Sequence, residues 1–209
     1  MVVKMPRERL DSLLDVLAAH FSHHRDTLDV IGRFGNRFED WFKWECAAAL
    51  HRASYTDLAE EIGYVAVECK YQYDLFAGSA LFDSALGFSP EHEGDVWLEL
   101  KARCTRDKGP SELAGDILRD QGKLLAWKQE RKGHCASLAL IVSHPEGTDA
   151  ENWIGAATGH LHLQKFRGAG APTARVRRIW RDIGWGTPSP SRLLAALVLW
   201  EVVPQKPGK

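Results

Sequence analysis

The chain has 209 residues, of which 44% are hydrophobic and 26% charged, as is ordinary for one globular domain. This composition excludes fibrous, collagen-like and wholly disordered chains. With 27 basic and 28 acidic residues the formal charge is -1, so the chain as a whole has no bulk attraction to nucleic acid or to an anionic membrane.

The four cysteines form no CxxC pair, which favours a reduced intracellular protein over a disulfide scaffold or a zinc ribbon. The first ten residues carry charge early and lack the apolar core of a signal peptide. The longest apolar runs, 138–142 and 193–200, are far shorter than the roughly 20 residues that cross a bilayer. We therefore expect a soluble, cytoplasmic protein with no membrane partner.

Two helices are predicted near the N-terminus. The first runs from about Glu8 to Asp26, and the second from about Arg37 to Arg52. Asn36 would cap the second helix, with Glu39 at the capping-box position.

A strand-rich stretch follows, and then helices and strands alternate. Alternating side chains predict strands at 64–73, 82–88 and 95–101, with a turn-rich connection at 89–94. The later predicted elements are a helix from Ser111 to about Arg131, a buried strand at 137–143, a short helix near 150–158 and an apolar strand or helix at 193–203. This order predicts an α/β (mixed α+β) fold in which helices flank a central mixed sheet with an antiparallel hairpin. We expect one domain over 1–209, with a core at about 36–143 and a C-terminal extension at 144–209.

The predicted hairpin gathers charged side chains on one face. In the strand at 95–101, Glu99 and Lys101 share the polar face. If this strand pairs antiparallel with 82–88 and both bury their apolar faces, Asp83 points to the same side. Two carboxylates and a nearby lysine are suited to holding Mg²⁺ and orienting a water.

Asp83, a short hairpin and then Glu99-Leu100-Lys101 resemble the D…(D/E)xK motif of the restriction-endonuclease-like, or PD-(D/E)xK, nuclease superfamily. The resemblance covers about 36–143, and Phe82 stands where the motif has proline. It implies that Asp83 and Glu99 bind the metal, with the Leu100 carbonyl as a third ligand. It also implies that Lys101 positions or helps to deprotonate the attacking water and steadies the phosphate.

ExK alone is a weak signal, because it occurs three times in this chain, at 68–70, 99–101 and 130–132. The third copy lies at the end of a predicted helix, where basic residues suit the helix dipole. The first lies on a strand, but Asp57 upstream of it falls in a turn or helix rather than a hairpin arm. The second copy is favoured, and an amphipathic hairpin with solvated charges remains the alternative.

Two helices add carboxylates to the predicted site. Glu45 lies within the apolar stripe of the second helix, so it is either buried or part of a site. The resemblance makes Glu45 the helix glutamate that completes the metal or water shell. Asp120 interrupts the apolar stripe of the helix after the hairpin, with Lys123 on its flank, and a buried carboxylate needs a partner. Glu68, on the polar side of its strand, is a further candidate for the same cluster.

Histidines 20, 23 and 24 also suggest a metal, but no carboxylate partner is evident in the sequence, which favours an ordinary helix surface. Substrate contacts are expected from the basic segment near the C-terminus, which carries Lys165, Arg167, Arg175, Arg177, Arg178 and Arg181 and no acidic residue between them.

The sequence thus predicts a Mg²⁺- or Mn²⁺-dependent nuclease that hydrolyses phosphodiesters, with DNA expected in preference to RNA. The alternative is a binding or interaction module of the same fold that has lost activity. Nothing in the sequence excludes a homodimer.

Overall fold

The computed structural model describes 6–35, 38–54, 64–69, 73–78, 96–106, 109–128, 134–144, 150–163, 174–183 and 195–204. The elements in chain order are α1 (Pro6–Ser22), α2 (Arg25–Phe34), α3 (Glu39–Ser54), β1 (Tyr64–Cys69), β2 (Tyr73–Gly78), β3 (Val96–Cys104), α4 (Pro110–Lys128), β4 (His134–Val142), α5 (Ala150–Leu163), β5 (Ala174–Asp182) and β6 (Ala195–Pro204).

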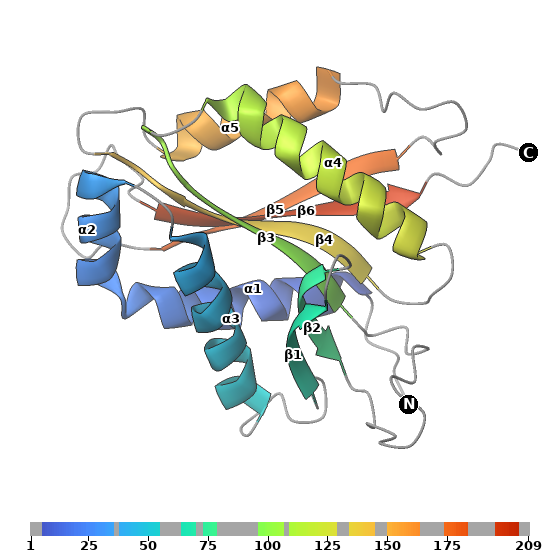
Figure 1. Ribbon diagram of the computed structural model, residues 1–209, viewed down its shortest axis with the longest axis horizontal. Helices are drawn as coiled ribbons and strands as arrows, with labels where there is room; N and C mark the ends of the chain where they lie inside the picture. The colour runs from blue at the N-terminus through green and yellow to red at the C-terminus, as the bar shows by residue number, and fades with distance from the viewer. Residues whose placement is uncertain are drawn as a thin grey trace, which may run out of the picture.

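The strands form one mixed sheet in the order β1-β2-β3-β4-β6-β5 (Figure 1). The β3–β4 pair is parallel and the other pairs are antiparallel. A parallel pair needs a crossover connection, and α4 supplies it. The predicted mixed sheet between helices is confirmed, and the C-terminal third of the chain adds β5 and β6 to the same sheet.

Helices cover both faces of the sheet, with α1, α2 and α3 on one side and α4 and α5 on the other (Figure 1). Alternate residues of the central strands point into the two hydrophobic cores, one on each face of the sheet. Leu98 and Leu100 of β3 enter the core beneath α1 and α3, whereas Ala139 and Ile141 of β4 enter the core beneath α4 and α5. The face of β3 that carries Glu99 is therefore the α4 face.

The first predicted helix is two helices. The chain bends after Ser22, where the backbone N–H groups of His23 and His24 donate to the carbonyls of His20 and Phe21 at 3.1 and 3.0 Å. These three-residue spacings tighten the last turn of α1 and redirect the chain. No glycine or proline marks this corner, so the sequence pattern continued one helix through it.

Glycine explains two features of α2. Gly35 ends the helix with φ 64°, a conformation that favours glycine, and its N–H donates to the Ile31 carbonyl at 2.8 Å. Gly32 allows α2 to lie against the end of β4, because a Cβ atom there would be 2.8 Å from the Ser143 carbonyl oxygen.

The second predicted helix begins later than expected. The first helical bond of α3 runs from the Phe42 N–H to the Phe38 carbonyl at 2.9 Å, and the helix starts at Glu39. Asn36 lies outside the described residues. Glu39 is the first helical residue, and its carboxylate bonds to a side chain of β3, so the predicted capping-box role is corrected.

The predicted hairpin partner of β3 is also corrected. β2 lies beside β3, with Leu75 opposite Leu98 and Ala77 opposite Val96, and β4 occupies the other edge. The strand predicted at 82–88 lies outside the described residues. The sequence placed the hairpin too late because it continued the alternating pattern of β1 through Tyr73, where β2 begins.

Candidate active site

An aspartate on β2 takes the place that the sequence gave to Asp83. Extending the β2–β3 register by one residue beyond the Leu75–Leu98 pair brings Asp74 opposite Glu99, so both project to the same face. The Asp74 carboxylate accepts a hydrogen bond from the Leu100 N–H at 2.8 Å. Asp83 itself lies outside the described residues.

Asp74 lies where the β2–β3 ladder ends. One carboxylate oxygen, Oδ2, accepts the Leu100 N–H, and the other, Oδ1, lies 3.0 Å from the Nζ of Lys43 on α3. The N–H and C=O of one residue in an extended strand point to the same edge, so the Leu100 carbonyl also faces the edge beside Asp74. Two carboxylates and one backbone carbonyl therefore approach one point of the sheet.

Charged groups around Glu99 shift its ionisation. Its side chain is only 7% exposed, and burial, followed by the charges of Asp120 and Asp74, raises the pKa of Glu99 to about 7. Lys123, with Nζ 3.6 Å from the Glu99 Oε1, and Lys101 oppose this shift. A carboxyl group in this state lacks enough positive charge nearby, and an added cation would favour its ionised form.

Lys101 is held as a cation. Its Nζ lies 2.8 Å from the Asp120 Oδ2 and 4.0 Å from the Glu39 Oε1. Burial opposes the charge, but the hydrogen bond and charge of Asp120, with Glu39 and Asp74, raise the pKa of Lys101 above its ordinary value. Lys101 is therefore suited to placing a positive charge beside Glu99 and not to accepting a proton.

The predicted α4 residues lie in this cluster. Asp120 is 5% exposed, and its Oδ1 lies 3.1 Å from the Nζ of Lys123 while its Oδ2 contacts Lys101. The partner that a buried carboxylate requires is thus present. The Lys123 side chain is 48% exposed, so it can leave the site at little cost.

A second ion-pair network surrounds Arg103, which lies two residues beyond Lys101 on β3. Arg103 donates to the Glu39 carboxylate at 2.9 Å and to the Asp116 carboxylate at 3.0 Å. Glu39 therefore joins α3 to β3 beside Lys101, a position that the sequence assigned to Glu45.

Polar groups continue across the sheet beyond Glu99. Ser137 of β4 lies opposite Glu99 in the register, and Trp200 of β6 lies opposite Ser137. Among the described residues, the Ser137 Oγ and the Trp200 Nε1 are buried and have no hydrogen-bond partner. Such groups cost roughly 1–3 kcal/mol each when left unpaired, so a buried water bonded to either one would stabilise the fold.

The register extends this line to both edges of the sheet. Glu68 of β1 falls opposite Asp74, between the Val67–Leu75 and Cys69–Tyr73 pairs, and Arg178 of β5 falls opposite Trp200. We call this line the cross-sheet row, and its six positions are Glu68, Asp74, Glu99, Ser137, Trp200 and Arg178. The sequence-predicted candidates Glu68 and Arg178 thus hold register positions in line with the site.

The basic residues of β5 hold register positions of both parities. Residues Arg175, Arg177 and Arg181 pair with Val203, Glu201 and Leu197, so they alternate with Arg178 along β5 and have the opposite parity. Lys165 and Arg167 lie outside the described residues.

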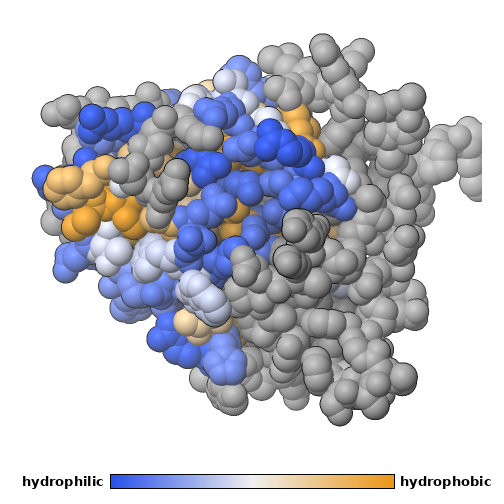
Figure 2. Space-filling view, viewed as in Figure 1, coloured by the Kyte–Doolittle hydropathy of each residue, from blue (hydrophilic) through white to orange (hydrophobic). Residues whose placement is uncertain are grey.

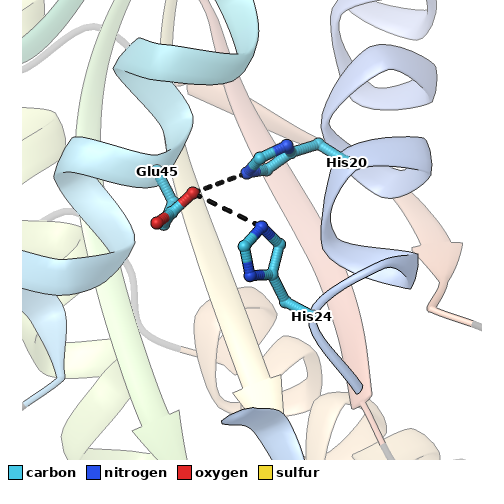
Figure 3. Close-up of side chains that lie close together, drawn as sticks. All are labelled: His20, His24 and Glu45. Carbon is cyan, nitrogen blue, oxygen red and sulfur yellow. Dashed lines mark hydrogen bonds and ion pairs between the residues drawn. The ribbon is translucent and has the colours of Figure 1, made fainter. Parts of the chain in front are cut away.

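Glu45 lies in a different cluster from Glu99. At about 100° per residue it is roughly 160° around α3 from Lys43, which contacts Asp74, and 120° from Glu39, which contacts Lys101 and Arg103. Glu45 instead accepts a hydrogen bond from the His20 Nε2 at 2.7 Å, and its Oε2 lies 3.5 Å from the His24 Nε2 (Figure 3). The sequence-based expectation that this histidine pair has no carboxylate partner is therefore wrong.

These three ligand atoms lie within 4.8 Å of one another and form a group that could hold a metal ion. Burial, the largest influence, lowers the pKa of His20 below its ordinary value, so its imidazole is neutral near pH 7. Pairing α1 with α3 through residues 25 apart in sequence has no local signature, and for that reason the sequence did not reveal it.

Sequence reasoning missed Asp74, Lys43 and Ser137. Asp74 had a readable signal, because it immediately precedes the apolar run Leu75-Phe76-Ala77 at the start of a strand. No such signal marks Lys43 or Ser137, which join the site through tertiary packing.

No protein-family model matches the chain, and neither a curated protein nor a solved structure shows significant similarity to it. Within the described ranges, every helix is too short or too polar to cross a membrane.

Proposed function

We propose that this protein is a divalent-metal-dependent nuclease with a restriction-endonuclease-like core, and that Asp74 replaces Asp83 in the D…(D/E)xK motif. The observation that carries the proposal is the bond from the Leu100 N–H to the Asp74 carboxylate, which joins Asp74 to Glu99-Leu100-Lys101 on the neighbouring strand. The order of α3, three antiparallel strands, α4 and a strand parallel to β3 supports it.

The donor set fits Mg²⁺ or Mn²⁺. Asp74, Glu99 and the Leu100 carbonyl offer hard oxygen ligands, which these ions prefer, and a cation bound beside Glu99 would oppose the burial and the carboxylate charges that raise its pKa. A bound divalent ion would supply charge for the phosphate and a more acidic water.

The protein side chains have separable roles in this proposal. Lys101, fixed by Asp120, holds a positive charge next to the reacting phosphate. Lys43 and Lys123 neutralise Asp74 and Glu99, and the half-exposed Lys123 side chain can turn toward a phosphate oxygen. Ser137 lies opposite Glu99 on β4 and is buried, so we assign it to the support of Glu99 and not to the substrate surface.

Nucleic acid, and DNA in preference to RNA, is the proposed substrate. Arg178, which holds the last register position of the cross-sheet row, is a candidate for contact with the phosphate backbone. The other predicted basic residues remain candidates for contacts outside this row.

The test is hydrolysis of mixed DNA and RNA substrates with Mg²⁺ or Mn²⁺ in the wild type and in Glu99→Gln. Cleavage and Mn²⁺ binding should fall together in Glu99→Gln, because the variant loses a charged ligand and keeps the side chain's size. Glu151→Gln, an exposed change on α5, is the matched control and should cleave at the wild-type rate. Binding of nucleic acid without cleavage in the wild type would contradict the proposal and favour the inactive binding module.

A further inference from the structure

The corner between α1 and α2 holds two imidazoles and one carboxylate that the proposed nuclease site does not use. His20 lies near the end of α1, His24 begins α2, and Glu45 projects from α3 between them (Figure 3). The side chains of His20, His24 and Glu45 are 13%, 31% and 24% exposed, so the group is sheltered but open to ions from solvent.

Helix capping does not explain why a histidine stands at position 24. It occupies the N-cap position of α2, where Ser, Thr, Asp or Asn is usual, and its side chain makes no capping hydrogen bond. Its ring turns instead toward Glu45 and packs near Phe21 and Trp41, with centroid distances of 6.3 and 6.0 Å. These aromatic rings fix the imidazole in a position that helix formation does not demand.

We infer that His20, His24 and Glu45 bind a transition-metal ion of the Zn²⁺ class, which joins the α1–α2 corner to α3. Two imidazole nitrogens and one carboxylate oxygen are ligands that Zn²⁺ accepts and that Mg²⁺ does not prefer. Tetrahedral bonds of about 2.0–2.1 Å place neighbouring ligand atoms about 3.3 Å apart. The observed distances from the Glu45 Oε2, 2.7 Å to His20 and 3.5 Å to His24, need only small side-chain shifts to meet this value.

Arg52 holds His20 in the tautomer that does not bind metal through Nε2, so removing Arg52 should strengthen metal binding. Its Nη2 donates to the His20 Nδ1 at 3.3 Å, which leaves the proton on Nε2, where it is donated to Glu45. A metal at Nε2 requires the proton on Nδ1, so Arg52 must withdraw from the ring. Its exposed position allows this movement, and its removal should favour the metal.

The site also has a structural consequence. Glu45 and Lys43 lie on nearly opposite sides of α3, so a metal at Glu45 would fix the helix that carries Lys43 to the cross-sheet row. At about 100 times its dissociation constant, the ion should raise the melting temperature by roughly 5–10 °C.

The test is titration of metal-free protein with Co²⁺, followed by its visible absorption, and with Zn²⁺, followed by the melting temperature. The intense visible absorption of one tetrahedral Co²⁺ should appear in the wild type and in His23→Ala, a matched control at the same corner whose ring bonds to the Ala19 carbonyl instead. Affinity should fall about 100-fold or more in His24→Ala and in Glu45→Gln, which keeps the size of the side chain and can still bond to His20. Arg52→Ala should bind Co²⁺ several-fold more tightly.

Wild-type affinity in both His24→Ala and Glu45→Gln would overturn the inference, and so would loss of Co²⁺ binding in Arg52→Ala. Failure of the nuclease proposal has a different signature, because it would appear in the Mg²⁺-dependent cleavage assay and leave these Co²⁺ titrations unchanged.

Discussion

Two clusters on α3 and its neighbours show how burial selects the chemistry of a site. In the cross-sheet row, burial and neighbouring carboxylates raise the pKa of Glu99 to about 7, so a proton competes with a metal ion near neutral pH. At the α1–α2 corner, burial lowers the pKa of His20, so the imidazole is already in the neutral form that metals bind. The same desolvation thus favours the protonated form of the Glu99 carboxyl group and the unprotonated form of the His20 imidazole.

The clusters also differ in their neutralising partners. Two carboxylates of the row have a lysine within reach, as Asp74 has Lys43 and Glu99 has Lys123, whereas Glu45 has two imidazoles. A hard divalent cation can replace the lysines as the partner of the carboxylates. Imidazoles bind a softer cation directly. We therefore expect the two clusters to respond to different metals and to different substitutions.

Loss of Lys101 should give the largest difference between the effect on cleavage and the effect on metal binding. Lys101→Ala should lower Mg²⁺-dependent cleavage by roughly 10²- to 10⁴-fold, the range for a positioned catalytic side chain, and change Mn²⁺ affinity little because lysine is not a ligand. Single-turnover cleavage and calorimetric Mn²⁺ titration measure the two effects.

Lys123→Ala is the control for Lys101→Ala, because it removes a more exposed lysine that also contacts Asp120. Equal loss of turnover in the two variants would indicate a general charge effect. It would count against a specific role for Lys101.

The ionisation of Glu99 should have a smaller effect, on how the free energy of unfolding depends on pH. Its folded pKa of about 7 exceeds the ordinary value of 4.5, so the fold favours the protonated carboxyl group. The stability that this group contributes is present below about pH 4.5 and is lost as pH rises through about 7. Glu99→Gln should remove this dependence, which we expect to amount to roughly 3–4 kcal/mol over the whole range at about 1.4 kcal/mol per pKa unit.

Urea unfolding of metal-free protein at pH 5 and pH 8 measures this change. The wild type should lose more stability than Glu99→Gln between the two pH values. Equal losses would show that Glu99 is ionised in the fold across this range.

The sequence predicted most of the elements because their periodicity is local. It placed α4, β3 and β4 within a few residues and predicted the mixed sheet between helices. The same periodicity identified Asp120 as a buried acid that needs a partner, and Lys101 is that partner.

Tertiary placement accounts for what the sequence missed. The apolar alternation of β1 runs to Tyr73, so it hid the turn into β2 and the aspartate at position 74. Glu45 and Glu39 both lie on α3, and only the packing of that helix decides which one reaches β3. The histidine site depends on the corner after Ser22, which no glycine or proline marks.

Exposed apolar side chains mark a surface outside both clusters. Figure 2 shows apolar residues at the surface over α2, where Val30 and Phe34 are 53% and 75% exposed, and Trp44 of α3 is 64% exposed. Single exposed apolar residues are common, and neither cluster includes these three.

The central claim is that Asp74 is the aspartate of the proposed active site. The most direct measurement is the Mg²⁺-dependent cleavage rate of Asp74→Asn beside Asp83→Asn. An asparagine at position 74 can still accept the Leu100 N–H, so the fold should persist while the charged ligand is lost. We expect a loss of at least about 10³-fold in Asp74→Asn, because a bound metal supplies several kcal/mol to such a reaction, and the wild-type rate in Asp83→Asn. Full activity in Asp74→Asn together with inactivity in Asp83→Asn would contradict the account.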